Sequence, residues 1–161
     1  MSLSIGDKLP EAEFLEMIGE DMETLSTGDL FTGKRVVVFA LPGAYTSTCT
    51  NRHLPSYVQN ADRIRTKGVD DIICLSVNDP FVMSAWGEAN GASGGNVRMI
   101  ADATGAFTKA VGMDFSVPSR GLIDRSRRYS MIVDNGVVVD LFAEEGTGCE
   151  ISAGETMLEK L

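Results

Sequence analysis

The chain has 161 residues, and its 14 Lys and Arg against 23 Asp and Glu give a formal net charge of −9. With 43% hydrophobic residues, residues 1–161 can bury a full core as one domain, which excludes the small disulfide-scaffold class. The acidity is spread along the chain, whereas nucleic-acid surfaces need clustered Lys and Arg. The longest apolar run, residues 36–41, is far below the roughly 20 residues that cross a bilayer. We therefore expect neither nucleic acid nor a membrane as partner.

The start of the sequence indicates the compartment, and the compartment decides how the cysteines are interpreted. The first residues lack the basic and apolar segments of a secretory signal, so we expect a cytoplasmic location. In that reducing compartment, Cys49, Cys74 and Cys149 are expected to be free thiols with possible chemistry rather than a structural disulfide framework.

Two apolar, β-branched segments predict central strands that are buried on both faces. These are residues 35–41 and 71–77. Between them, residues 54–64 carry apolar side chains at helical spacing, and Gly68 follows as a helix stop. The three segments together predict a βαβ unit with parallel strands.

A second helix and a third strand follow. Asp79 and Pro80 supply an N-cap and a first-turn proline, which predict a helix. Its predicted buried stripe consists of Val82, Ala85, Trp86 and Ala89. Residues 97–101 then predict a strand, and residues 104–111 predict a short helix that ends at Gly112.

The last third of the chain predicts a hairpin and a final helix. Asn135-Gly136 separates residues 128–133 from residues 137–142, and this dipeptide is a strong signal for a two-residue hairpin turn. Ser152, with a Glu three residues later, predicts a capping box at the start of the last helix. The order of elements predicts a thioredoxin-like α/β sandwich, a central mixed β-sheet flanked by helices, with an N-terminal extension.

Cys49 follows the first predicted strand and its loop, at the edge of the sheet where open α/β proteins bind ligands. It lies in the first turn of the predicted helix, where unpaired N–H groups and the helix dipole favour a thiolate. Position alone leaves open that Cys49 is a small buried hydrophobe. Thr46 occupies the place of the second cysteine of a C-x-x-C motif, which disfavours dithiol exchange, and its hydroxyl can turn toward the sulfur or a bound oxygen.

Residues 42–55 carry the pattern P-x-x-x-T-x-x-C followed by His-Leu-Pro, which resembles the active-site signature of the peroxiredoxins. Residues 73–83 and 125–131 look like the type II, or Prx5-like, branch of that family, so the resemblance covers almost the full length. It implies the thioredoxin-like fold. It also implies a thiol peroxidase, without a cofactor, that reduces hydrogen peroxide and alkyl hydroperoxides to water and alcohols.

The resemblance also implies a role for each residue of the site. Cys49 would be the peroxidatic nucleophile, which becomes a sulfenic acid when it attacks the peroxide. Thr46 would hold the peroxide, Pro42 would shield the sulfur from water, and Arg128 would direct its guanidinium at sulfur and oxygen. Residues 120–128 hold four Arg and one Asp, and only the match before Tyr-Ser-Met singles out Arg128.

The sulfenic acid must then be reduced again. The position matching Cys74 resolves it in some members of the branch, but here Cys74 lies in a predicted buried strand, where an inert core thiol is an equal alternative. A bond to Cys49 would require partial unwinding of the first predicted helix. Cys149 is a weaker candidate. Otherwise an external thiol reductant, namely glutathione, glutaredoxin or thioredoxin, performs this step. Relatives commonly pair as homodimers.

The same residues also suggest other functions. His53 is the single histidine and lies four residues after Cys49, as in a Cys-His hydrolase or a metal site. One histidine leaves no ligand set for a closed zinc site and no oxyanion-hole pattern accompanies it, so we expect no metal and a role in packing and hydrogen bonding. A binding module whose cysteine senses oxidant without turnover stays as the alternative from another class.

Overall fold

The computed structural model describes residues 2–92, 94–146 and 148–161. Its strands are β1 (Glu13–Ile18), β2 (Asp21–Ser26), β3 (Arg35–Ala40), β4 (Asp71–Ser76), β5 (Arg98–Ala101), β6 (Asp114–Val117), β7 (Leu122–Ser126), β8 (Tyr129–Asp134) and β9 (Val137–Ala143). Its helices are α1 (Thr27–Phe31), α2 (Leu54–Thr66), α3 (Pro80–Ala89), α4 (Ala106–Ala110) and α5 (Gly154–Lys160). A π-helical turn η1 (Cys49–His53) precedes α2, and a 3₁₀ turn η2 (Pro118–Arg120) joins β6 to β7.

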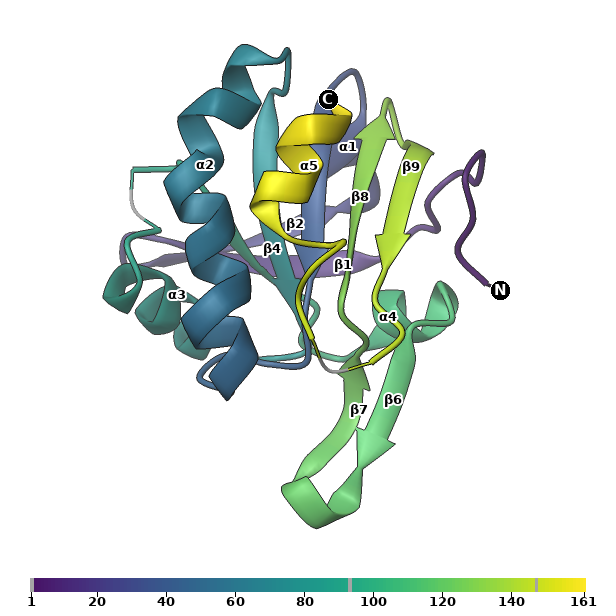
Figure 1. Cartoon of the computed structure of the whole chain (residues 1–161). Coiled ribbons are helices and arrows are strands. Elements are labelled where there is room, and N and C mark those ends of the chain that lie inside the picture. Colours follow the sequence, from purple (N-terminus) through teal and green to yellow (C-terminus); the bar gives the residue numbers. More distant parts are fainter. Residues whose placement is uncertain (1, 93, 147) are drawn as a thin grey trace.

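A mixed sheet forms the centre of the molecule. Among the described residues, seven strands pair in the order β2-β1-β5-β4-β3-β8-β9, and β6 pairs with β7 in a separate hairpin (Figure 1). Strands β3, β4 and β5 are parallel, whereas β8 and β9 are antiparallel, which confirms the predicted mixed sheet. The N-terminal extension adds the β1–β2 hairpin at one edge, antiparallel to β5.

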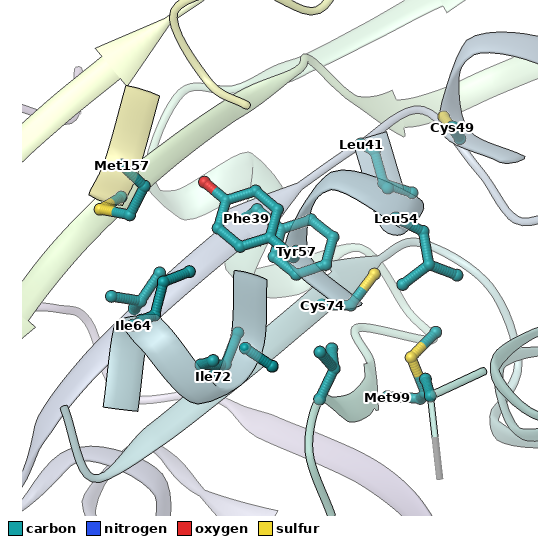
Figure 2. Packing of buried hydrophobic residues seen from close by; sticks show 14 of the residues in the cluster. Phe39, Leu41, Cys49, Leu54, Tyr57, Ile64, Ile72, Cys74, Met99 and Met157 are labelled. Carbon is teal, nitrogen blue, oxygen red and sulfur yellow. The ribbon is translucent and has the colours of Figure 1, made fainter. Parts of the chain in front are cut away.

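Strand β3 separates two apolar cores. Val37 and Phe39 point to the core beneath α2, α3 and α5, whereas Val36 and Val38 point to the core beneath α1 and α4. All four side chains are fully buried, as the uninterrupted apolar run predicts. The Phe39 ring stacks on Tyr57 of α2 with 4.0 Å between ring centroids (Figure 2).

The predicted stripe on α3 was wrong at its two alanines. Trp86 is buried as predicted, but Ala85 and Ala89 are exposed, and the buried side of the helix also carries Met83 and Gly87. The helix packs so closely on β5 that a Cβ at Gly87 would lie 2.6 Å from Cγ of the Met99 side chain. Close packing against the sheet therefore rotates α3 away from the face that its alanines suggest.

The predicted capping box at the start of the last helix is also wrong. Helix α5 begins at Gly154 with Ala153 as its N-cap, and Ala153 makes no side-chain cap. The Ser152 hydroxyl donates to Glu144 Oε2 at 2.6 Å instead, because a carboxylate accepts a stronger hydrogen bond than a neutral group does. The predicted hairpin turn is present, with φ of 47° at Asn135 and 80° at Gly136.

In the part of the chain that the structure describes, every helix is too short or too polar to span a membrane.

Candidate active site

Cys49 begins the helix that follows strand β3. The turn Cys49–His53 runs directly into α2, and the Leu54 N–H donates to the Cys49 carbonyl five residues earlier. Pro55 accounts for this wide turn, because a proline inside a helix has no N–H to donate and its ring clashes with the carbonyl four residues earlier. Cys49 thus lies in a first helical turn, where unpaired N–H groups and the helix dipole favour an anion.

Side chains from elsewhere in the fold hold the loop between β3 and η1. Asn78, just beyond the carboxyl end of β4, accepts hydrogen bonds from the Ala44 N–H at 3.0 Å and the Ser76 hydroxyl at 2.7 Å. Arg125 of β7 donates from Nη1 to the Pro42 carbonyl at 3.1 Å. These bonds pair backbone groups that no helix or strand satisfies, so they fix the loop relative to the sheet.

Arg128 contacts the sulfur. Its Nη2 donates to Cys49 Sγ at 3.3 Å, and its Nη1 donates to His53 Nδ1 at 2.8 Å. Strands β3 and β8 pair Ala40 with Tyr129, and this register brings Arg128 to the start of the loop that leads to Cys49. Cys49 and His53 are fully buried, and Arg128 is 5% exposed, so little water screens the guanidinium at the sulfur.

His53 is a neutral hydrogen-bonding group in this site. Burial, and then the positive charge of Arg128, lower the pKa of His53 to about 3. A guanidinium can only donate, so Nδ1 accepts and the ring proton lies on Nε2. Nε2 donates to the Ser152 carbonyl at 3.1 Å, and the same carbonyl accepts from the Tyr57 hydroxyl at 2.7 Å. His53 therefore orients Arg128, in agreement with the predicted hydrogen-bonding role.

Thr46 uses its hydroxyl hydrogen within the loop. Oγ1 donates to the Gly43 carbonyl at 2.7 Å, and the Thr46 carbonyl accepts from the Thr50 N–H at 3.0 Å. The hydroxyl is therefore oriented without donating to Cys49. Its oxygen keeps lone pairs that can accept a hydrogen bond from a ligand.

A pocket of about 680 Å³ opens beside these groups. Pro42, Thr46 and Arg128 line it, together with residues of the β6–β7 hairpin and of the turn after β9. Cys49 is fully buried, so its sulfur lies behind the residues that line the pocket. Because Arg128 both contacts Sγ and lines the pocket, it connects the two. The structure thus gathers Pro42, Thr46, Cys49 and Arg128 at one end of the sheet.

The other two cysteines have different surroundings. Cys74 is fully buried in β4, opposite Phe39 of β3, and belongs to the same apolar core as Cys49 (Figure 2). Cys149 is 6% exposed, with its Sγ 3.9 Å from Ser152 Oγ. Burial raises the pKa of the Cys74 thiol well above its ordinary range, and burial also raises the pKa of Cys149. All three cysteines are free thiols.

Several supporting residues were not predicted from the sequence. Glu144 Oε2 accepts hydrogen bonds from the Ser152 N–H at 2.9 Å, the Ser152 hydroxyl and the Glu150 N–H at 2.8 Å. Partial burial opposes ionisation of Glu144, but these hydrogen bonds outweigh it and lower its pKa. Asn78 could have been found, since it directly follows a predicted strand at the ligand-binding edge. Glu144 has no comparable signal. Within the described residues, no group of three or more His, Cys, Asp and Glu side chains could hold a metal ion.

Known proteins resemble this chain over almost its whole length. The Redoxin family model matches residues 4–158. Peroxiredoxin-2C of Oryza sativa subsp. japonica is 41% identical over 160 residues, which cover 99% of this chain and 98% of that protein. Hybrid peroxiredoxin hyPrx5 of Haemophilus influenzae is 42% identical over 164 residues, which cover 100% of this chain and 67% of that protein.

Solved structures agree with the sequence relatives. The crystal structure of reduced Prx3 from Vibrio vulnificus in complex with H₂O₂ has 44% sequence identity to this chain and a TM-score of 0.93, and the match covers 98% of each chain. The predicted thioredoxin-like fold and thiol peroxidase activity are both confirmed by these relatives. The chain belongs to the redoxin family, and within that family it is a peroxiredoxin.

Proposed function

We propose that Cys49 is the peroxidatic cysteine of this peroxiredoxin and that it reduces hydrogen peroxide and alkyl hydroperoxides. The hydrogen bond from Arg128 to Cys49 Sγ, at 3.3 Å, carries the proposal. A cationic donor at a buried sulfur favours the thiolate, which is the nucleophilic form. Pro42 lines the pocket beside this pair and, by our proposal, keeps water from the thiolate.

In the proposed step the thiolate of Cys49 attacks the distal oxygen of the hydroperoxide. An S–O bond forms while the O–O bond breaks, and the proximal oxygen leaves with the electron pair and takes a proton to become water or an alcohol. Cys49 ends as a sulfenic acid. Arg128 is held by His53, so its charge faces the departing oxygen without having to reorganise. Thr46 Oγ1 accepts from the peroxide O–H, because its own hydrogen is used by Gly43.

Single-turnover oxidation by H₂O₂, followed by stopped-flow, tests the assignment. The Cys49→Ser variant should not consume peroxide, whereas Cys74→Ser and Cys149→Ser should react as the parent does, since among the described residues Arg128 donates to Cys49 and to neither of these thiols. Peroxide consumption by Cys49→Ser at the parent's rate would refute the proposal.

We further propose that an external thiol, which can be glutathione, glutaredoxin or thioredoxin, reduces the sulfenic acid. The burial of Cys74 within β4 supports this, because a bond to Cys49 would require the first helical turn to unwind. Mass spectrometry after one equivalent of peroxide tests it. A sulfenic acid trapped by dimedone is expected. A disulfide from Cys49 to Cys74 or to Cys149 would show that the chain resolves its own intermediate.

The remaining proposals are a cytoplasmic location and a homodimer. The three free cysteines fit a reducing compartment. Tyr45 and Phe81 are 59% and 61% exposed, and Tyr45 lies 6.5 Å from Trp86 between ring centroids, so apolar surface is available for a second copy. Cell fractionation tests the first proposal. Sedimentation of the reduced protein at twice the chain mass would support the second, and sedimentation as a monomer would contradict it.

A further inference from the structure

The pocket beside Arg128 is larger than hydrogen peroxide needs. Its volume is about 680 Å³, whereas a water molecule takes up roughly 30 Å³ in the liquid. Part of its lining comes from the β6–β7 hairpin, which extends beyond the main sheet (Figure 1). Phe115 and Val117 of β6 and Leu122 of β7 line this part, so its wall is apolar. The pocket thus has room for a long apolar group behind a reacting oxygen.

The charged side chains that line the pocket favour an anionic ligand. Arg120 and Arg127 line the pocket in addition to Arg128, and neither forms an ion pair with another described residue. Glu144 and Glu145 also line the pocket, so its lining holds three guanidinium groups and two carboxylates. Glu144 is already hydrogen-bonded within its own turn. The pocket therefore has a positive balance inside a chain of net charge −9.

The β6–β7 hairpin sets the distance between Arg120 and Arg128. Arg120 lies in the turn η2 at the hairpin tip, whereas Arg128 lies beyond the other end of β7. Strand β7 has five residues, so its four steps of about 3.3 Å separate tip from base by roughly 13 Å. A ligand that reaches from the sulfur to Arg120 must be elongated, apolar in its middle and anionic at its far end.

We propose that the groove along the β6–β7 hairpin binds long-chain hydroperoxides that carry a carboxylate, with the chain on Phe115, Val117 and Leu122 and the carboxylate at Arg120. The proposal rests on Cys49 as the reacting sulfur. The chemistry is that of the proposed step: the distal oxygen is transferred to Cys49, the O–O electron pair leaves with the chain-bound oxygen, and a hydroxy acid is released. An external thiol then reduces the sulfenic acid. Arg120 is thereby a specificity-determining residue.

Single-turnover oxidation with three oxidants tests this without involving the reductant. The oxidants are linoleic acid hydroperoxide below its micellar concentration, the methyl ester of the same hydroperoxide, and H₂O₂. In the parent, the acid should react faster than the ester. Arg120→Gln should lower the rate constant for the acid about five-fold, the most that an exposed ion pair typically contributes, and should leave those for the ester and H₂O₂ unchanged.

Two further variants sharpen the test. Arg127→Gln removes the same charge from the base of the hairpin, so it should affect the acid less than Arg120→Gln does. Leu122→Asn should slow the acid and the ester alike and leave H₂O₂ unchanged. Equal rates for acid and ester in the parent, or an equal effect of Arg120→Gln and Arg127→Gln, would overturn the proposed carboxylate position. Failure of the parent to react with H₂O₂ would instead refute the role of Cys49.

Discussion

His53 should make the folded chain unusually sensitive to mild acid. It is the single histidine of the chain. In the unfolded chain its pKa has the ordinary histidine value of 6.5. In the folded chain burial and Arg128 lower this pKa to about 3. Between these two values the unfolded chain binds a proton that the folded chain does not. The free energy of unfolding therefore has its full His53 contribution above pH 6.5 and loses it as the pH falls toward 3.

The size of the loss follows from the two pKa values. One unit of pKa corresponds to about 1.36 kcal/mol, so lowering the pH from 7 to 5 should cost the folded state about 2 kcal/mol through His53 alone. The carboxyl groups add little in this interval, because unfolded Asp and Glu titrate near pH 4. A loss of this size is a substantial part of the stability of a typical domain.

Urea unfolding at pH 7 and pH 5, under reducing conditions, measures the effect in the parent and in His53→Gln. Glutamine keeps a donor for the Ser152 carbonyl but does not titrate. The parent should lose about 2 kcal/mol between the two pH values, and the variant should lose less than about 0.5 kcal/mol. Only the pH difference within each protein is compared, since the variant packs less well at both. Equal losses in the two proteins would refute a neutral, buried His53.

Three other substitutions test the site and its frame. Arg128→Lys should slow oxidation by H₂O₂ about 100-fold, because an ammonium group cannot bond the sulfur and the imidazole in a fixed fork as a guanidinium does, and a nearly unchanged rate in stopped-flow would contradict this. Gly154→Ala should cost about 3 kcal/mol in urea unfolding, since its Cβ would collide with the backbone carbonyl of Ser56. Gly87→Ala should cost less than about 1 kcal/mol, because the flexible Met99 side chain can move and alanine favours the helix; the reverse order of these two costs would be inconsistent with the packing.

The centre of the fold could be predicted because its signals are local. Strands β3 and β4 are buried on both faces and appear in the sequence as apolar runs, and Asn135-Gly136 adopts the positive φ values that its hairpin turn requires. The β6–β7 hairpin gave no such signal. Its strands are short and half-exposed, so little apolar surface marks them in the sequence.

Some residues of the site likewise have a local signal in the sequence, and others have none. Thr46 and Cys49 lie within one loop and helix turn, so their spacing alone suggested chemistry. Arg128 reaches the sulfur through the pairing of β3 with β8, and charge could not distinguish it from the other arginines of residues 120–128. Resemblance to a family was therefore needed to choose it. The Ser152 motif led to a wrong prediction. A capping box requires the serine side chain to bond a nearby backbone N–H, whereas in the fold the Ser152 hydroxyl donates to the Glu144 carboxylate.

The cation at the sulfur thus depends on a chain of contacts that begins far away in the sequence. Glu144 holds the turn that carries the Ser152 carbonyl, that carbonyl accepts from His53, and His53 accepts from Arg128. Each group is tied to a partner on a different element, so no single element determines where the guanidinium lies. Preorganisation of this kind stabilises a developing charge without reorganisation during the reaction. The turn between β9 and α5 is consequently part of the proposed peroxidatic site, although the Ser152 carbonyl is connected to the sulfur only through two other side chains.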